Sequence, residues 1–176
     1  MNIKLRFSET EIEYWAQRYE YPLEQTLLIN LRSKVQQAGY LTKEQLRMVA
    51  RWKAPRSAGH IEKNEEEYVK EITAWSLSAK EERSKIEVLT LLDGVQWPSA
   101  SIILHLFHKE AYPILDFRAL WSVGLEVPKQ YSFSFWWKYV KFCRNIAQRN
   151  SLNMRTLDRA LWQFSRENQK TKKAVQ

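Results

Sequence analysis

The chain has 176 residues, 44% of them apolar and 13% aromatic, which is enough for a buried core and excludes a wholly disordered protein. Its single cysteine, Cys143, excludes an internal disulfide, a cysteine-rich zinc site and a cysteine-ligated iron–sulfur cluster. The net charge is +8, and the whole excess lies in residues 129–176, which carry 11 Lys and Arg against 2 acids and so suit a polyanion such as nucleic acid.

Helix signals begin near the amino end of the chain. Ser8 with Glu11 forms a capping-box pattern that opens a first helix. Pro22 and Gly39 bracket a second helix over residues 23–38, because proline suits a first helical turn and glycine suits the residue after a helix. We therefore expect the chain to open with two helices.

Each of the next three helices opens on Ser, Thr or Asn with Glu or Gln three residues later, which is the same capping pattern. The pairs are Thr42 with Gln45, Asn64 with Glu67, and Ser78 with Glu81. We expect the helices that they open to end at Trp52, before Ser78 and at Leu92, respectively. Residues 56–63 are then the segment most expected to be an exposed loop.

Four further helices complete the pattern. They are expected over residues 98–107, 117–124, 133–149 and 154–167. No run of residues alternates with the period of two that a strand shows, so the sequence predicts an all-α fold of about nine short helices. We expect one domain over residues 1–176, of which residues 167–176 form a frayed tail.

A glycine turn separates the fifth and sixth expected helices. Asp93 and Gly94 end the first of them, and Pro98 begins the second without needing a hydrogen bond for its nitrogen. The amides of the turn, of Ser99 and of Ala100 lie near a helix N-terminus, which is a ready site for an anion such as a DNA phosphate. An ordinary turn between two helices is the alternative, and the turn alone favours it.

An aspartate stands downstream of this turn. Asp116 follows Gly94 by 22 residues, at the end of an apolar run and at the start of a helix. Asp favours the N-cap position, and a carboxylate that caps with one oxygen keeps a second for chemistry. Arg118, two residues on, either meets a phosphate or pairs with a neighbour.

Together these residues resemble the helix-hairpin-helix DNA glycosylase superfamily. In that family a Leu-x-Gly-Val-Gly-x-x-Thr-Ala hairpin precedes a catalytic aspartate by a spacing that matches Gly94 to Asp116. The hairpin residues that agree are Leu92, Gly94, Val95 and Ala100, with Ser99 where Thr is usual. Arg118 stands where His or Arg follows the catalytic residue. The motifs cover residues 79–125, and the helix count extends the resemblance over the chain.

The resemblance implies a fold of two lobes, with the hairpin and a catalytic Asp116 between them. It implies a monofunctional glycosylase on double-stranded DNA, because Pro98 stands where bifunctional members carry a lysine nucleophile, so no lyase activity is expected. Gln96 replaces the second glycine of the hairpin, so the loop approaches a phosphate less closely. No cofactor and no metal are expected, since His105 and His108 have no third ligand nearby in the sequence.

The implied mechanism places Asp116 beside the sugar of a flipped nucleotide. Its carboxylate would stabilise the oxocarbenium-like charge that develops as the N-glycosidic bond breaks, and would orient the attacking water. The base is left open: alkylated purines in DNA repair, or modified bases of foreign or phage DNA in antiviral defence.

A second candidate segment is Arg51-Trp52-Lys53-Ala54-Pro55-Arg56, where a ring and three cations meet at a helix end. Trp52 is expected to line the base pocket, or equally to be a core residue beside solvated cations. The residues expected to contact DNA are Lys53, Arg56, Gly94, Val95, Gln96, Trp97, Ser99 and Arg118. At the tip of the hairpin, Trp97 packs under the loop or faces the DNA backbone.

The basic carboxyl-terminal region extends this expected interface. Four arginines there are interpreted as contacts to the backbone of a duplex: Arg144, Arg149, Arg155 and Arg159. Four other tryptophans lie at helical spacing and are expected in the core: Trp121, Trp136, Trp137 and Trp162. The sequence shows neither a signal peptide nor a membrane span, so we expect a cytoplasmic monomer without a membrane partner.

Two other functions remain open from the residues. A non-catalytic DNA-binding protein would keep the hairpin for grip and use Asp116 only as a cap, and Gln96 favours that alternative. A helical protein-interaction module with a basic tail for solubility is the third, against which the spacing from Gly94 to Asp116 argues. Release of free bases separates the first two functions, and a steep salt dependence of DNA binding tests the third.

Overall fold

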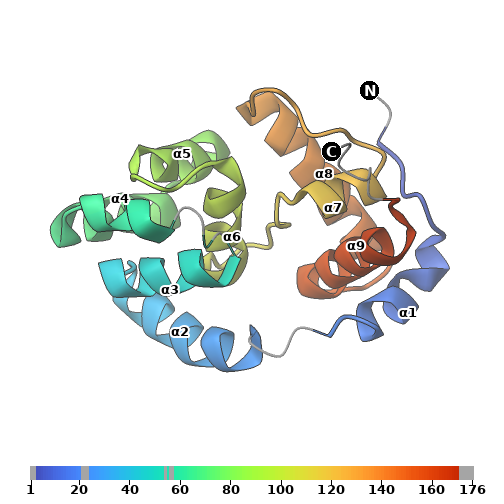
Figure 1. The fold of residues 1–176 in the computed structure, drawn as a ribbon, viewed down its shortest axis with the longest axis horizontal. Helices are drawn as coiled ribbons and strands as arrows, with labels where there is room; N and C mark the ends of the chain where they lie inside the picture. Colours follow the sequence, from blue (N-terminus) through green and yellow to red (C-terminus); the bar gives the residue numbers. More distant parts are fainter. Residues whose placement is uncertain (1–2, 21–23, 54, 56–57, 171–176) are drawn as a thin grey trace, which may run out of the picture.

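The computed structural model describes residues 3–20, 24–53, 55 and 58–170, with the backbone alone for 24–30 and 53 (Figure 1). Over these residues the protein is helical and has no strand, as the sequence predicts. Its α-helices are α1 (Ile12–Gln17), α2 (Glu24–Ala38), α3 (Lys43–Lys53), α4 (Glu66–Ser78), α5 (Glu82–Glu87), α6 (Trp97–Phe107), α7 (Phe117–Ser122), α8 (Phe133–Arg149) and α9 (Met154–Asn168). Three 3-10 segments join them: η1 (Glu9–Glu11), η2 (Ala58–Lys63) and η3 (Val88–Leu91).

The helices gather in two lobes. Helices α2 to α6 form one, which we call the central lobe, and α1 with α7, α8 and α9 form the other, which we call the terminal lobe (Figure 1). Residues 108–116, which we call the linker, run from α6 in the first to α7 in the second. The amino-terminal segment joins the terminal lobe because Lys4 and Arg6 donate backbone hydrogen bonds to Val123 and Ser122, at 3.1 and 2.9 Å.

Local signals fixed several helix ends as predicted. Ser8 and Glu11 form the expected capping box. Gln45 N–H donates to Thr42 Oγ1 at 3.2 Å, and Thr42 N–H donates to Gln45 Oε1 at 2.8 Å, so the box at α3 is also confirmed. Gly39 follows α2 with φ of +78°, a left-handed conformation that glycine adopts without a steric cost.

Two expected capping boxes are wrong. The N-cap residues of α4 and α5 are Glu65 and Glu81, and neither helix has a side-chain cap. The Ser78 hydroxyl instead donates to the Ala74 carbonyl at 2.8 Å, so it belongs to the end of α4. Asn64 is buried and binds a distant turn. Each side chain found a partner that a local pattern does not include.

The expected exposed loop over residues 56–63 is confirmed in its exposure at most of its described residues, but it is wrong in its conformation and at Ile61. Residues 58–63 form η2, and Ile61 is fully buried in the core. The fifth helix is shorter than predicted, because α5 ends at Glu87 and tightens into η3. Burial of an apolar side chain such as Ile61 outweighs the polar composition of its neighbours.

Candidate active site and nucleic-acid interface

The turn between η3 and α6 has the geometry of a tight hairpin. Gly94 adopts φ of +82°, and Val95 N–H donates to Leu92 O at 3.0 Å, which closes the turn. Gln96 is the N-cap of α6 and makes no side-chain cap, and Pro98 lies in the first turn. First-turn amides have no intrahelical acceptor, so those of Trp97 and Ser99 suit an anion.

A buried amide side chain holds this turn in place. Asn64 is 4% exposed, and its Oδ1 accepts the Asp93 N–H at 2.8 Å. Its Nδ2 donates to the carbonyls of Asp93 and Ile61, each at 3.0 Å. The hairpin is therefore fixed to η2 and to the start of α4. The sequence offered only a helix-start signal at Asn64, so this role was missed.

The expected hairpin contacts differ in exposure. Gln96 is exposed, while Gly94 and Ser99 are half-buried. Val95 is 1% exposed, so its side chain belongs to the core and only its backbone lies near the turn surface. Trp97 is half-buried, and its ring centroid lies 6.4 Å from that of Trp136, which matches packing under the loop.

Asp116 is the N-cap of α7, as the sequence predicts. Its Oδ1 accepts the Arg118 N–H at 2.8 Å, and the residue is half-buried with an extended backbone, φ −125° and ψ 144°. This bond sets the orientation of the carboxylate at the end of the linker.

Three buried side chains bind the backbone just before Asp116. Leu115 N–H donates to the Ser101 hydroxyl at 2.8 Å. Ile114 N–H donates to Asp158 Oδ1 at 3.3 Å, and its carbonyl accepts from the Tyr139 hydroxyl at 3.1 Å. These partners come from α6, α9 and α8, so both lobes hold the segment that positions the carboxylate.

A tyrosine titrates under the influence of this aspartate. Burial raises the pKa of the Tyr131 hydroxyl, and the negative charge of Asp116 raises it further. The half-buried Tyr131 precedes α8, and no motif in the sequence pointed to it.

Comparison with known proteins finds no matching family model, no curated relative and no solved structure of significant similarity. The resemblance to helix-hairpin-helix glycosylases therefore stays a prediction from the sequence around Gly94 and Asp116. Among the described residues, no helix has both the length and the apolar character needed to cross a bilayer.

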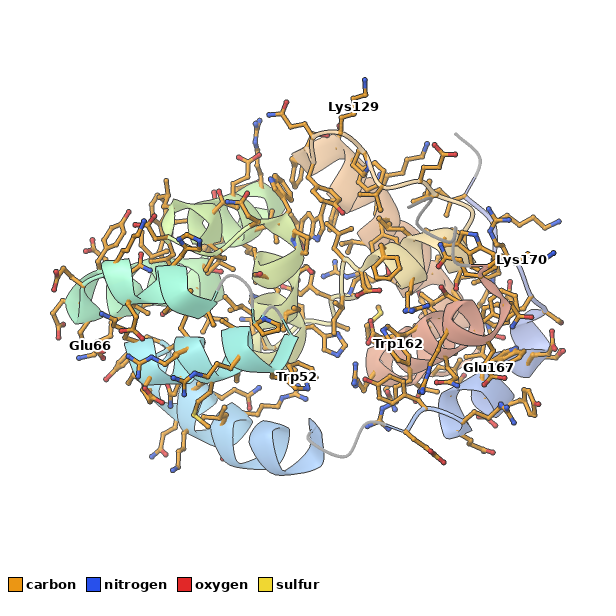
Figure 2. The ribbon with its side chains drawn as sticks, viewed as in Figure 1. Trp52, Glu66, Lys129, Trp162, Glu167 and Lys170 are labelled. Carbon is orange, nitrogen blue, oxygen red and sulfur yellow. The ribbon has the colours of Figure 1, made fainter. Side chains whose placement is uncertain are left out.

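Beyond Asp116, aromatic rings and guanidinium groups alternate along the surface. The Arg118 guanidinium lies 5.0 Å from the Phe117 ring and 5.5 Å from the Trp162 ring. Phe117 is 52% exposed. Trp162, labelled on α9 in Figure 2, also lies under Arg166 at 5.5 Å and is half-buried, so it is not the core residue we expected. We call Phe117, Arg118, Trp162 and Arg166 the cation–π ladder.

The second candidate segment is described only in part. Trp52 is half-buried, packs against the core and lies at the end of α3 nearer the terminal lobe (Figure 2). The side chain of Lys53 and all of Arg56 lie outside the described residues. The expected role of Trp52 in a base pocket stays a prediction.

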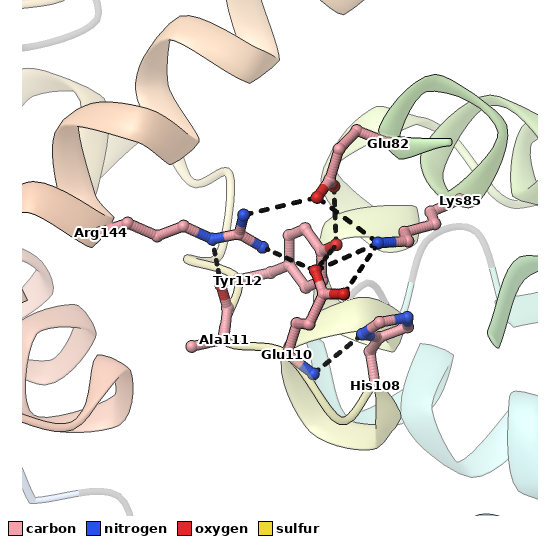
Figure 3. A network of polar contacts seen from close by, with 7 residues as sticks. All are labelled: Glu82, Lys85, His108, Glu110, Ala111, Tyr112 and Arg144. Carbon is pink, nitrogen blue, oxygen red and sulfur yellow. Dashed lines mark hydrogen bonds and ion pairs between the residues drawn. The ribbon is translucent and has the colours of Figure 1, made fainter. Parts of the chain in front are cut away.

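A polar network that includes linker residues connects the two lobes (Figure 3). Lys85 is buried, and its ammonium lies 3.1 Å from Glu110 and 3.4 Å from Glu82. The Tyr112 hydroxyl donates to Glu82 at 2.7 Å. Arg144 of α8 donates to the Ala111 carbonyl at 2.9 Å and lies 3.4 Å from both carboxylates.

The environment of this network lowers the pKa values of Glu110 and His108. Burial acts to raise the pKa of Glu110, but hydrogen bonds from Lys85 and Tyr112 and the charge of Lys85 lower it to about 2. Burial, followed by the charge of Lys85, lowers the pKa of His108. His108 Nδ1 accepts the Glu110 N–H at 3.0 Å, as a neutral imidazole does.

The structure gives partners to the four arginines that were expected to contact a duplex, and that expected role stays a prediction. Arg144 is held by Glu82 and Glu110, Arg149 is paired with Glu9 and Arg155 with Asp158. Each of these guanidinium groups therefore lies in an ion pair within the protein. Arg159 lies over the Tyr19 ring at 5.7 Å.

The two histidines also have structural partners. His105 Nδ1 donates to the Tyr112 carbonyl at 2.6 Å, and His108 is 2% exposed. Within the described part of the chain, no three His, Cys, Asp or Glu side chains come together as metal ligands would.

Proposed function

We propose that this protein is a monofunctional DNA glycosylase that hydrolyses the bond between a flipped base and its sugar in double-stranded DNA. The observation that carries the proposal is the fixation of Asp116, whose preceding residues are bound by Ser101, Asp158 and Tyr139. A carboxylate that stabilises a developing charge works best when its position is set before the reaction, because no reorganisation is then needed.

Hydrolysis of the N-glycosidic bond requires one carboxylate and one water molecule. As the C1′–N bond breaks, the sugar gains oxocarbenium-like positive charge, which the Asp116 carboxylate stabilises. The oxygen of a water then bonds to C1′, the base nitrogen takes a proton, and a free base and an abasic sugar result. Pro98, at the start of α6, offers no amine for a Schiff base, so strand cleavage by that route does not follow.

DNA is held by features on both sides of Asp116. The first turn of α6, which Gln96 does not cap with its side chain, offers amides to a phosphate of one strand. Phe117, the next residue after Asp116, offers an exposed ring, and the Arg118 guanidinium lies 5.0 Å from that ring. Aromatic rings of this kind stack on bases without requiring a particular sequence. We further propose that the protein acts as a monomer in the cytoplasm.

A non-catalytic DNA-binding protein is the second candidate. Gln96 favours it, because an exposed side chain stands in the loop where a glycine would let a phosphate approach more closely. In that case Asp116 only caps α7.

One experiment separates the two. Duplexes that carry alkylated purines or phage-type modified bases are incubated with the protein, free bases are measured by mass spectrometry, and binding is measured by fluorescence anisotropy. Free base above the protein-free control supports the glycosylase. Binding with no base released from any duplex supports the second candidate.

A further inference from the structure

A cavity of about 270 Å³ lies between the two lobes, beside the linker. Its walls come from α2, the end of α6, the linker and the start of α9, so neither lobe forms it alone. The polar side chains on its walls are Arg32, His105, Lys109, Glu110, Asn153 and Arg155. Its volume is just below the range of about 300–1,000 Å³ typical of sites for drug-sized ligands, so a small group fits it best.

Positive charge dominates these walls. Arg32, Lys109 and Arg155 are cations from three different segments, and among the described residues Glu110 is the only carboxylate that lines the cavity. Glu110 is already bound by Lys85 and Arg144. Lys85 and Arg144, which do not line the cavity, therefore neutralise the negative charge of Glu110.

Arg155 is paired with Asp158, whose other oxygen accepts the Ile114 N–H just before Asp116. The positive excess of the cavity wall therefore comes mainly from Arg32 and Lys109. Burial, followed by the positive charge of Arg155, lowers the pKa of Arg159, one turn along α9. An anion bound in the cavity would offset this repulsion.

We propose that the cavity binds a phosphate group. Three long cationic side chains from separate segments match the several oxygens that a phosphate offers, and guanidinium and ammonium groups bind it through charge-assisted hydrogen bonds. The phosphate belongs either to a DNA backbone or to a free nucleotide. This site stands apart from base release, because Asp116 and the hairpin do not line it.

The test uses two double variants of equal charge. Arg32→Ala with Lys109→Ala removes two exposed cations from the cavity wall. The control, Lys129→Ala with Lys170→Ala, removes two exposed cations from the terminal lobe, at positions away from α2 (Figure 2). Inorganic phosphate, a deoxynucleoside 5′-monophosphate and a duplex are titrated into each protein by calorimetry, at one ionic strength and with acetate as a control salt.

The cavity variant should bind phosphate or the monophosphate at least about tenfold more weakly than the control variant. If a free nucleotide is the ligand, both variants bind the duplex alike. If the DNA backbone is the source, the cavity variant also loses duplex affinity relative to the control, and inorganic phosphate competes with the duplex. The proposal is overturned if the two double variants bind every probe equally.

A second measurement needs no variant. Amide chemical shifts of the wild-type protein are followed during titration with inorganic phosphate. Saturable shifts should concentrate at residues 105–112 and 153–155, which form the cavity wall. Absence of saturable shifts there with both phosphate and duplex would overturn the proposal even if a variant failed to fold.

Discussion

The backbone N–H of Leu115 donates a hydrogen bond of 2.8 Å to the hydroxyl of Ser101, and Ser101 is fully buried. This bond joins the helix that begins at the hairpin to the residue immediately before Asp116. The element proposed to hold a phosphate and the element proposed to act on the sugar are therefore parts of one rigid arrangement. Their separation is set by the interior of α6, whose middle is apolar and buried.

Removing this hydroxyl should destabilise the fold. Ser101→Ala leaves the buried Leu115 N–H without its acceptor, and an unsatisfied buried group costs about 1–3 kcal/mol. Urea unfolding measures the change in the free energy of unfolding. Ser134→Ala is the matched control, because Ser134 is exposed, and we expect a change within about 0.5 kcal/mol there. Equal stability of the two variants would show that the bond does not hold the linker.

The polar network should make stability fall in acid. The pKa of Glu110 is lowered from 4.5 to about 2, so its charged form stabilises the fold above pH 4.5, and this contribution is lost as the pH falls toward 2. Glu110→Gln has no such charge to lose. Unfolding free energies measured from pH 5 to pH 2 should therefore decline less steeply for this variant. Parallel curves for variant and wild type would exclude Glu110 as a source of acid sensitivity.

The exposed ring of Phe117, which follows Asp116 in the chain, should matter for nucleic-acid binding and not for folding. Phe117→Ala is expected to weaken binding to a duplex with an unpaired 2-aminopurine by about tenfold, and to reduce the fluorescence gain that reports unstacking. Trp75→Ala is the control, since Trp75 is 55% exposed on α4 of the central lobe. If both variants bind and unstack the probe like wild type, Phe117 is only a surface residue.

The buried Asn64 should control the order of the hairpin. Asn64→Ala removes the acceptor of the Asp93 N–H and two donors to backbone carbonyls, at a cost of about 1–3 kcal/mol. Amide hydrogen exchange should accelerate at residues 93–95 more than in the middle of α8. Uniform acceleration across the protein would mean that Asn64 stabilises the fold as a whole and does not hold the turn specifically.

Signals that act within a few residues were predictable from the sequence. The capping boxes at Ser8 and Thr42, the glycine after α2 and the N-cap at Asp116 all depend on groups no more than four residues apart. Apolar spacing gave the all-α class and the bounds of α8 for the same reason. Side chains of the right type at Asn64 and Ser78 misled the prediction: Asn64 binds a turn 29 residues away, and Ser78 binds a carbonyl of the helix that precedes it instead of capping the next one.

The side chains that bind the backbone before Asp116 could not be predicted from a local sequence pattern. Ser101 and Asp158 lie 14 and 44 residues from the backbone groups that they bind. Nothing in the spacing of these polar residues distinguishes them from solvated ones on a helix surface. The cation–π ladder was missed likewise, because it combines the start of α7 with one face of α9.

The most direct test of the account is the release of free bases by the wild-type protein and by Asp116→Asn, measured by mass spectrometry on the panel of modified duplexes. The amide keeps the oxygen that accepts the Arg118 N–H but lacks the charge that stabilises the sugar. We predict base release by the wild type, a loss of about hundredfold or more in the variant, and unchanged affinity for DNA. Full activity in Asp116→Asn, or no base released by the wild type from any duplex, would contradict the account.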